Sequence, residues 1–501
     1  MKIDKRYIFK QTFWMYTFAY LAAPLGYLIR VIYARSFAVE EFGLIYSIIG
    51  LISLISIFND FGFTETLNYH ATRFYEKKEY SKVKGSLIFA FLMQCSTALI
   101  LALLFYFLSP YLAEHYFRTE IAVSTFRWFL LYLIFFNISR PIIQIFVATH
   151  NYYYGNLAEF LRNVMVLVLS GLMIFYAPLK TTDYVGAVWG ISVFSLVALF
   201  YFLSKKKFPE IYKSKADLSR GLYRKLFNYA IIVIVGNGAM IFLSTMDVVL
   251  LTYLRNLYEV GLYSIALALA LVLTTLTGPM VGIVFPLVSK LNVNKDNEGI
   301  KKIIGIVYNT GLYLILPALV IFVVYPSEII SLLFGGKYTL AANALIVLSF
   351  AYFLNVFGSF NFQMMAGLGL IKERMKIFYI SAFVNFVADV VLILSYGMIG
   401  AALGTLITMV VLFSLSYHLI ARRFAVILNK KAIGKTVASS ILIFFIIYFL
   451  KGAITTNIFI EIGIILAISG SIYASIGHFW GILDYRELLK MIKEGRTKKS
   501  G

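Results

Sequence analysis

Two arginines and three aspartates lie deep inside long apolar stretches of the sequence. They are Arg30, Arg140, Asp60, Asp247 and Asp389. A charge at the centre of a membrane-spanning helix costs about 2.5–3.5 kcal/mol on insertion scales, so such residues usually face a partner or an internal cavity. An arginine binds anions through two parallel hydrogen bonds. A desolvated aspartate holds a proton more tightly than it does in water. These side chains are therefore the first candidates for a functional site.

Other polar side chains accompany these charges. Two are arginines nearer the ends of the apolar stretches and three are amides within them: Arg73, Arg162, Gln144, Asn237 and Gln363. A purely structural interpretation stays open for several of these residues. Arg140 and Asp60 could form an internal ion pair that ties two helices together, or Asp60 could bind backbone groups at a helix kink.

The composition requires a membrane as the solvent for these elements. Of the 501 residues 61% are hydrophobic and 14% are charged, and no soluble fold buries that much apolar surface. Apolar runs of about 20 residues, which is the length needed to cross the bilayer, recur along the chain. We predict an all-α integral membrane protein with about fourteen transmembrane helices, and its first apolar run is too long for a cleaved signal. The predicted spans are 11–34, 42–66, 86–108, 124–148, 157–178, 184–204, 227–253, 258–288, 303–325, 340–366, 377–396, 399–421, 433–450 and 462–483.

The basic residues indicate the orientation of these spans. The chain has 45 Lys and Arg against 24 Asp and Glu. With a cytoplasmic N-terminus most of the basic residues lie in cytoplasmic segments, as the positive-inside rule requires. We therefore expect both termini to be cytoplasmic. The densest basic segment, Lys205–Lys225, is interpreted as a cytoplasmic linker between the lobes in preference to a lipid-binding or nucleic-acid-binding patch.

An internal repeat divides the chain into two similar halves. Glu41–Leu44 resembles Glu259–Leu262, and Gly186–Gly190 resembles Gly400–Gly404. Each predicted unit has an even number of helices, so both units enter the membrane in the same direction. This arrangement predicts two six-helix lobes around a central cleft, suited to alternating access, although duplication could also simply enlarge a scaffold. The predicted parts are a first lobe at 1–204, a linker at 205–226, a second lobe at 227–424, and two further helices with a basic tail at 425–501.

Two stretches of the first lobe carry a family resemblance. Ala34–Leu44, followed by Asn59–Phe63, resembles the start of the polysaccharide (O-antigen type) flippases of the multidrug/oligosaccharidyl-lipid/polysaccharide exporter superfamily. The resemblance extends to the repeat, the helix number and the basic linker, and so covers essentially the whole chain. It implies a monomeric plasma-membrane transporter that flips lipid-linked oligosaccharides by alternating access for the export of surface polysaccharide.

The resemblance assigns roles to the candidate residues. A lipid-linked oligosaccharide carries a pyrophosphate, so Arg30 and Arg140 are the first candidates for its head group, and Arg162 with Arg73 for a cytoplasmic contact site. The amides Gln144, Asn237 and Gln363 are candidates for sugar hydroxyl groups. The carboxylates Asp60, Asp247 and Asp389 are candidates for coupling to a proton or Na⁺ gradient. The expected partners are this substrate and membrane lipids.

Other functions fit the sequence less well. The single Cys95 and five scattered histidines give no metal or redox site, and no nucleophile with a base and no phosphate-binding glycine loop is evident, so we expect neither an enzyme nor a cofactor. A multidrug/cation antiporter of the same superfamily typically has twelve helices and acidic drug sites. A flippase for a peptidoglycan-type lipid precursor shares both the helix number and the deep arginines. These two alternatives remain open from the sequence.

Overall fold

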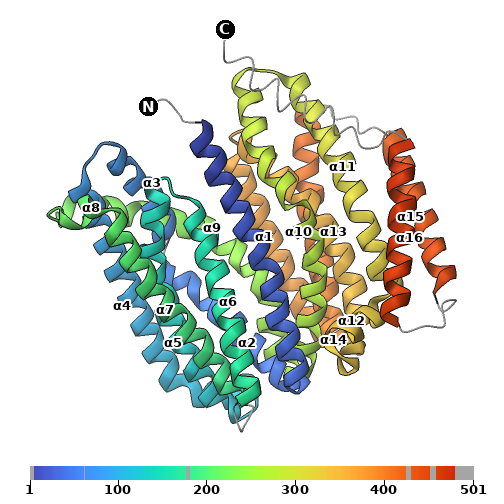
Figure 1. Ribbon diagram of the computed structural model, residues 1–501, viewed down its shortest axis with the longest axis horizontal. Helices are drawn as coiled ribbons and strands as arrows, with labels where there is room; N and C mark the ends of the chain where they lie inside the picture. Colours follow the sequence, from blue (N-terminus) through green and yellow to red (C-terminus); the bar gives the residue numbers. More distant parts are fainter. Residues whose placement is uncertain (1–4, 61, 177–180, 425–429, 452–457, 480–501) are drawn as a thin grey trace. The chain divides into compact units, whose positions relative to one another are not determined.

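All the secondary structure that can be described is helical (Figure 1). The structure is a computed structural model that describes residues 5–60, 62–176, 181–424, 430–451 and 458–479. The prediction of an all-α protein is therefore confirmed. The helices are α1 (Lys5–Ser36), α2 (Val39–Asp60), α3 (Phe63–Glu76), α4 (Tyr80–Leu112), η1 (Ala113–Phe117), α5 (Ile121–Ala148), α6 (Tyr153–Tyr176), α7 (Thr182–Lys207), α8 (Pro209–Lys213), α9 (Arg220–Leu254), α10 (Leu257–Val293), α11 (Asn297–Val324), α12 (Pro326–Phe334), η2 (Gly336–Ala341), α13 (Ala342–Gly367), α14 (Ile371–Phe424), α15 (Lys430–Leu450) and α16 (Ile458–Phe479).

Two glycines mark breaks between helices, one inside a predicted span and one between two predicted spans. The predicted span 42–66 is broken where α2 ends at Asp60 and α3 begins at Phe63, and Gly62 between them has a φ of 71°, which favours glycine. The range α14 holds two helices that meet at Gly397, which has non-helical dihedrals with a φ of 57°, between the predicted spans 377–396 and 399–421. The break at Gly62 reflects local backbone geometry, which hydropathy does not report.

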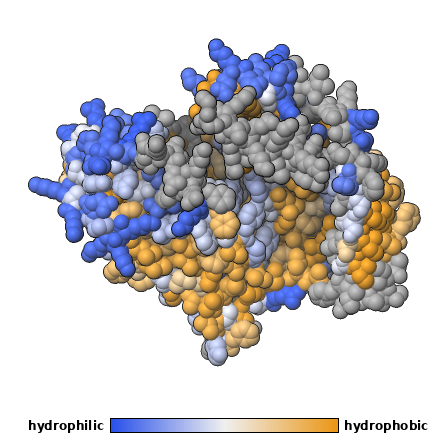
Figure 2. Space-filling view, turned by 45° about the horizontal axis from the view of Figure 1, so that its top comes forward, coloured by the Kyte–Doolittle hydropathy of each residue, from blue (hydrophilic) through white to orange (hydrophobic). Residues whose placement is uncertain are grey.

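Eleven stretches among the described residues are long and apolar enough to cross a membrane. The joined helix α14 counts once among them, so the number fourteen stays a prediction. Large apolar side chains point outward from these helices: Phe107 is 76% exposed and Phe175 is 85% exposed. Figure 2 shows the resulting broad apolar field on one face of the molecule. Exposed aromatic residues at this density are stable only against lipid, and the protein is a multi-pass membrane protein.

The chain divides into two compact units, Met1–Gly261 and Leu262–Gly501. The predicted lobes and linker were defined by the internal repeat, whereas these units are defined by compactness. The two kinds of boundary need not coincide, so the lobes and the linker stay a prediction. The helix α9 would open the second lobe, yet it packs on α2 and α3, and the Ser47 and Thr252 hydroxyl groups are hydrogen-bonded at 2.7 Å.

Polar side chains fix the directions of the helices in the first unit. Asn156 on α6 donates to the backbone oxygen of Met15 on α1 at 2.8 Å, and Asn163 donates to the oxygen of Ala22 at 3.0 Å. Residues later in α6 therefore meet residues later in α1, and the two helices run in the same direction. The helix α7 packs along α5, which completes the wall around the polar pocket described below.

Glycines allow the two copies of the repeated motif to touch within this unit. A Cβ atom added at Gly43 would lie 1.9 Å from the backbone oxygen of Leu257, and one added at Gly261 would lie 2.4 Å from the oxygen of Val39. The start of α2 and the start of α10 thus cross at van der Waals distance through equivalent glycines. The second unit has its own polar core, in which the Tyr308 hydroxyl donates to Asn361 at 2.7 Å.

Candidate functional site

A polar pocket of about 290 Å³ lies between α5, α6 and α7. Its charged and amide side chains are Arg140, Gln144, Glu159 and Arg162, and Phe136 forms part of the apolar wall. Residues three or four positions apart share one face of a helix, so Arg140 with Gln144 on α5, and Glu159 with Arg162 on α6, point the same way. The structure thus brings together three of the residues selected from the sequence, namely Arg140, Gln144 and Arg162.

The Arg140 side chain lies between this pocket and the end of α2. Its Nη1 atom lies 3.9 Å from Oδ1 of Asp60, and its guanidinium carbon lies 4.9 Å from the centre of the Phe136 ring. A separation of 3.9 Å is too long for a hydrogen bond. Among the described residues Arg140 forms no hydrogen bond, so its donors are available to a ligand in the pocket.

Two neutral side chains bind Asp60 by hydrogen bonds. Its Oδ1 atom accepts hydrogen bonds from the Thr64 hydroxyl at 2.5 Å and from the Gln94 amide nitrogen at 3.0 Å. These bonds tie the end of α2 to α3 and α4 across the break at Gly62. Of the two structural interpretations made from the sequence, the pairing with Arg140 is present at 3.9 Å, whereas the hydrogen bonds of Asp60 at the break come from side chains, where backbone groups were expected.

Arg162 and Gln144 retain unused hydrogen-bonding atoms in the pocket. Arg162 lies 3.5 Å from a carboxylate oxygen of Glu159, which balances its charge in part. The Arg162 Nε atom and the Gln144 Oε1 atom are buried and have no hydrogen-bond partner among the residues that the structure describes. A buried polar group without a partner costs about 1–3 kcal/mol, so a ligand that supplies an acceptor and a donor would be stabilised here.

The other two selected arginines do not line this pocket. The Arg30 Nε atom donates to the Tyr46 hydroxyl at 3.0 Å, and its guanidinium lies 4.4 Å from the centre of that ring. Arg73 on α3 is exposed and stacks 3.9 Å from the centre of the Tyr69 ring. Of the four selected arginines, Arg140 and Arg162 therefore line the pocket, whereas Arg30 and Arg73 lie against tyrosine rings.

The remaining selected residues lie elsewhere. The Asn237 side chain lies outside the described part of the chain, and Gln363 is a partly buried residue of α13 in the second unit. Asp247 on α9 is 7% exposed and Asp389 on α14 is fully buried. A Cβ atom added at Gly404 would lie 2.0 Å from Oδ1 of Asp389, so only a glycine accommodates this carboxylate. In the described ranges no three His, Cys, Asp or Glu side chains form a group that could hold a metal ion.

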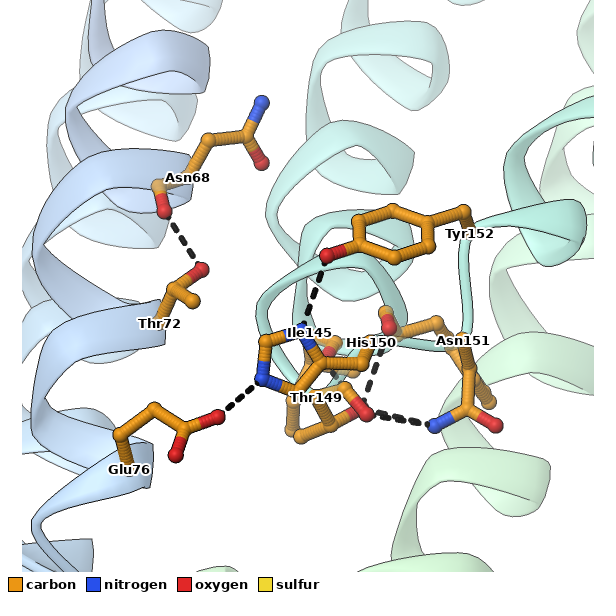
Figure 3. Close-up of polar contacts among 9 residues, drawn as sticks. Asn68, Thr72, Glu76, Ile145, Thr149, His150, Asn151 and Tyr152 are labelled. Atoms are coloured by element: carbon orange, nitrogen blue, oxygen red, sulfur yellow. Dashed lines mark hydrogen bonds and ion pairs between the residues drawn. The ribbon is translucent and has the colours of Figure 1, made fainter. Parts of the chain in front are cut away.

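A further polar cluster, which was not predicted from the sequence, connects α3 with the loop between α5 and α6 (Figure 3). One ring nitrogen of His150 contacts the Glu76 carboxylate, and the other lies 2.8 Å from the Tyr152 hydroxyl. Burial, and then the charge of Glu76, raise the pKa of Tyr152. The adjacent Asn151 accepts a hydrogen bond from Lys207 at 2.7 Å, which joins the end of α7 to the same loop.

Comparison with solved structures identifies the class of this fold. The lipid II flippase MurJ in an inward closed conformation superposes with a TM-score of 0.71 at 16% identity, covering 95% of this chain and 99% of that one. An inward-facing multidrug resistance MATE family transporter of the MOP superfamily gives a TM-score of 0.67 at 12% identity, covering 80% and 94%. The chain is thus a polytopic membrane protein with the fold of the MOP transporters.

Sequence comparison gives the family. Residues 8–292 match the family described as polysaccharide biosynthesis protein, and the chain belongs to that family. An uncharacterised membrane protein of Methanocaldococcus jannaschii is 27% identical over 398 residues, 77% of this chain and 78% of that protein. The probable low-salt glycan biosynthesis flippase Agl15 of Haloferax volcanii is 25% identical over 262 residues, 52% of this chain and 53% of that protein. The family resemblance noted in the sequence is confirmed.

Proposed function

We propose that this protein flips lipid-linked oligosaccharides across the plasma membrane, and that the pyrophosphate head group binds in the polar pocket of the first unit. The observation that carries the proposal is the pairing of Arg140 and Arg162 on facing helices in one pocket. The family membership and the similarity to the Haloferax protein, a probable glycan biosynthesis flippase, support the same substrate class.

The chemistry of the pocket suits an anion better than a cation. Arg140 forms no hydrogen bond with any residue that the structure describes, and it can offer two parallel bonds to phosphate oxygens. Arg162 adds a second guanidinium, and its partner Glu159 offsets only part of the positive charge. A cationic drug would lose its hydration next to two guanidinium groups, so the drug antiporter is the weaker candidate.

The size of the pocket limits what it can hold. A volume of about 290 Å³ lies at the lower end of the roughly 300–1,000 Å³ typical of small-molecule sites. The pocket therefore holds the head group and at most the first sugar, and the rest of the glycan stays outside it. In this arrangement Gln144 accepts a hydrogen bond from that first sugar.

The other selected residues keep proposed roles outside this pocket. Arg30 and Arg73 are proposed contacts for the head group at other stages of transport, and Asn237 and Gln363 for sugars. Asp60, Asp247 and Asp389 are proposed to couple transport to a proton or Na⁺ gradient. Asp60 is the strongest of the three, because neutralising it would remove the charge that lies 3.9 Å from Arg140. We also propose that the protein is a monomer and that both of its termini lie in the cytoplasm.

The test is flipping of a fluorescent lipid-pyrophosphate oligosaccharide in proteoliposomes that contain the wild type or Arg140→Gln. We expect the variant to flip this lipid at least tenfold more slowly than the wild type. Arg127→Gln is a matched control, because Arg127 is also on α5 but donates to the Ser109 hydroxyl at 2.9 Å and lines a different hollow. Equal rates for the wild type and Arg140→Gln would exclude the proposed head-group site. Transport of a cationic dye in place of the lipid would favour the antiporter.

A further inference from the structure

A second pocket in the first unit is almost entirely apolar. It has a volume of about 520 Å³ and is formed by α4, α5, α7 and α8. The two ends of this pocket differ in polarity. Lys84 and Tyr212 lie at one end, whereas Phe91, Ile138 and Phe194 lie at the other. Such a gradient matches a molecule with one polar end and one hydrocarbon end.

The length of the pocket fits one leaflet of a bilayer. From Lys84 to Phe91 the helix α4 rises by about 10 Å, at 1.5 Å per residue. Half of a hydrocarbon core of about 30 Å is about 15 Å. A hydrocarbon chain that starts at the level of Lys84 would therefore run along the pocket for most of one leaflet.

The ammonium group of Lys84 stands at the polar end of the apolar pocket. It donates to the backbone oxygens of Tyr212 at 2.6 Å and Ser214 at 2.9 Å. In the described part of the chain Lys84 has no carboxylate partner, and one of its three hydrogens is not used by these bonds. The end of α7 and the segment after it also carry exposed lysines: Lys205, Lys206, Lys213 and Lys215. The positive charge at this end of the pocket favours the binding of an anion.

We propose that the apolar pocket binds one hydrocarbon chain of a membrane lipid whose negatively charged head group lies at Lys84. Charge complementarity selects an anionic lipid over a zwitterionic one, because Lys84 has no carboxylate partner in the described part of the chain and the lysines of residues 205–215 outnumber the two carboxylates on this segment, Glu210 and Asp217. The proposal does not depend on the transported substrate, since the polar pocket lies on another face of α5. Pro141 lines the apolar pocket, and its neighbour Arg140 lines the polar one.

A hollow of the same volume serves as an internal comparison. It also measures about 520 Å³ and lies between α4 and α5, toward η1. Its arginine, Arg127, already binds Ser109 and the Tyr106 ring, at 2.9 Å and 4.2 Å, and Glu120 adds a negative charge. The charge of Arg127 is thus already compensated, and we expect this second hollow to show no preference for anionic lipid.

The bound lipid would act on the segment that joins α7 to α9. Ile211 and Tyr212 of α8 form part of the pocket wall, and the Tyr212 hydroxyl is hydrogen-bonded to Ser204. A few residues later the backbone nitrogen of Asp217 donates to the oxygen of Ser81 on α4 at 3.0 Å. A lipid chain against α8 would therefore stabilise the connection between α7 and α9.

The test compares lipid retention by native mass spectrometry after delipidation and addition of phosphatidylglycerol or phosphatidylcholine with identical chains. We expect the wild type to retain one phosphatidylglycerol at least fivefold more than phosphatidylcholine. Val197→Trp fills the pocket and should abolish this retention, whereas Val123→Trp, the same change at a similarly buried position in the second hollow, should not. Lys84→Gln should remove the preference between lipids, and Lys82→Gln should keep it, because Lys82 is paired with Glu79 at 3.0 Å.

A measurement on the unmodified chain guards against misfolded variants. Phosphatidylglycerol with a photoreactive group in its chain should crosslink to residues 84–91 and 194–202 in preference to the rest of the protein. Retention that is equal for both lipids, or equal in Val197→Trp and the wild type, would overturn the proposal. So would displacement of the phosphatidylglycerol by polyprenyl pyrophosphate, since the pocket would then belong to the transported lipid.

Discussion

The guanidinium of Arg140 on α5 faces the carboxylate of Asp60 at the end of α2, with 3.9 Å between Nη1 and Oδ1. At this distance Asp60 attracts Arg140 but does not occupy its hydrogen-bond donors. The carboxylate is positioned instead by Thr64 and Gln94. Arg140 is thus electrostatically balanced and still available, which is the state expected of an anion site before its ligand arrives.

Asp60→Asn should strengthen the binding of an anionic head group. The amide oxygen can still accept from Thr64 and Gln94, so mainly the charge is lost. Two unit charges about 4 Å apart attract by about 4 kcal/mol at an effective dielectric constant of 20, and partial exposure of Arg140 reduces this value. We expect roughly tenfold tighter binding of a fluorescent lipid pyrophosphate in equilibrium titrations, with slower turnover. Binding that is unchanged or weaker would show that Asp60 does not compete for Arg140.

The reciprocal glycines at the crossing of α2 and α10 should not tolerate a methyl group. In Gly43→Ala the new Cβ atom would meet a backbone oxygen at 1.9 Å, and in Gly261→Ala at 2.4 Å. Because neither oxygen can rotate away, the helices must separate, and overpacking of this kind costs about 1–3 kcal/mol. Each variant should unfold at a lower temperature in detergent.

The control for these glycines is Gly171→Ala in α6, where nothing lies within 4 Å of the added Cβ atom. Alanine has a higher helix propensity than glycine by about 0.8–1.0 kcal/mol, so this variant should unfold at the same or a higher temperature. If all three substitutions shift the unfolding temperature alike, the close crossing of α2 and α10 is not present in the protein.

Stability should depend on pH through His70 on α3, outside the eleven apolar stretches. Burial, and then the nearby charges of Lys225 and Arg73, lower the pKa of His70. The unfolded chain therefore binds a proton near pH 6.5 that the folded chain does not bind, so stability falls as the pH drops below that value. In thermal unfolding His70→Gln should lose less stability between pH 7.5 and 5.5 than the wild type does.

A neutral change on the same helix separates this effect from general destabilisation. Thr72→Ala removes a hydroxyl that donates to the backbone oxygen of Asn68 at 2.6 Å, and it removes no titratable group. This variant should have the wild-type dependence on pH at a slightly different stability. A His70→Gln variant with the full wild-type dependence would assign the effect to other groups.

Hydropathy and spacing predicted the helical membrane fold well, because a span of about 20 apolar residues has few other solutions in a bilayer. They also selected Arg140, Gln144 and Arg162, which the structure places in one pocket, since a charge or amide inside a span needs a partner. They did not predict which way each side chain faces. Arg30 turns to Tyr46 and Arg73 stacks on Tyr69, and such choices depend on packing between helices.

Two features of the first unit leave no trace in the local sequence pattern. The contact between Glu76 and His150 joins residues from separate helices and becomes visible only when α3 meets the loop after α5. The apolar pocket is defined by the concave shape of the surface and not by its residue types. Its wall consists of the same Leu, Ile, Val and Phe side chains that cover any membrane helix, so composition does not distinguish a concave surface from a convex one.

The role proposed for Gln144 leads to a prediction about sugar recognition. Its Oε1 atom is buried in the polar pocket without a hydrogen-bond partner among the described residues. A hydroxyl of the first sugar would satisfy this atom, whereas a lipid pyrophosphate without sugar would leave it unsatisfied, at a cost of about 1–3 kcal/mol. Gln144→Leu removes the acceptor at a similar volume. The ratio of affinities for lipid pyrophosphate with and without the first sugar, measured by equilibrium titration, should then fall roughly tenfold or more. Gln94→Leu, which removes an amide that binds Asp60 outside the pocket lining, should leave the ratio unchanged. A wild-type ratio in Gln144→Leu would mean that the first sugar does not bind at Gln144, and the polar pocket would then recognise only the anionic head group.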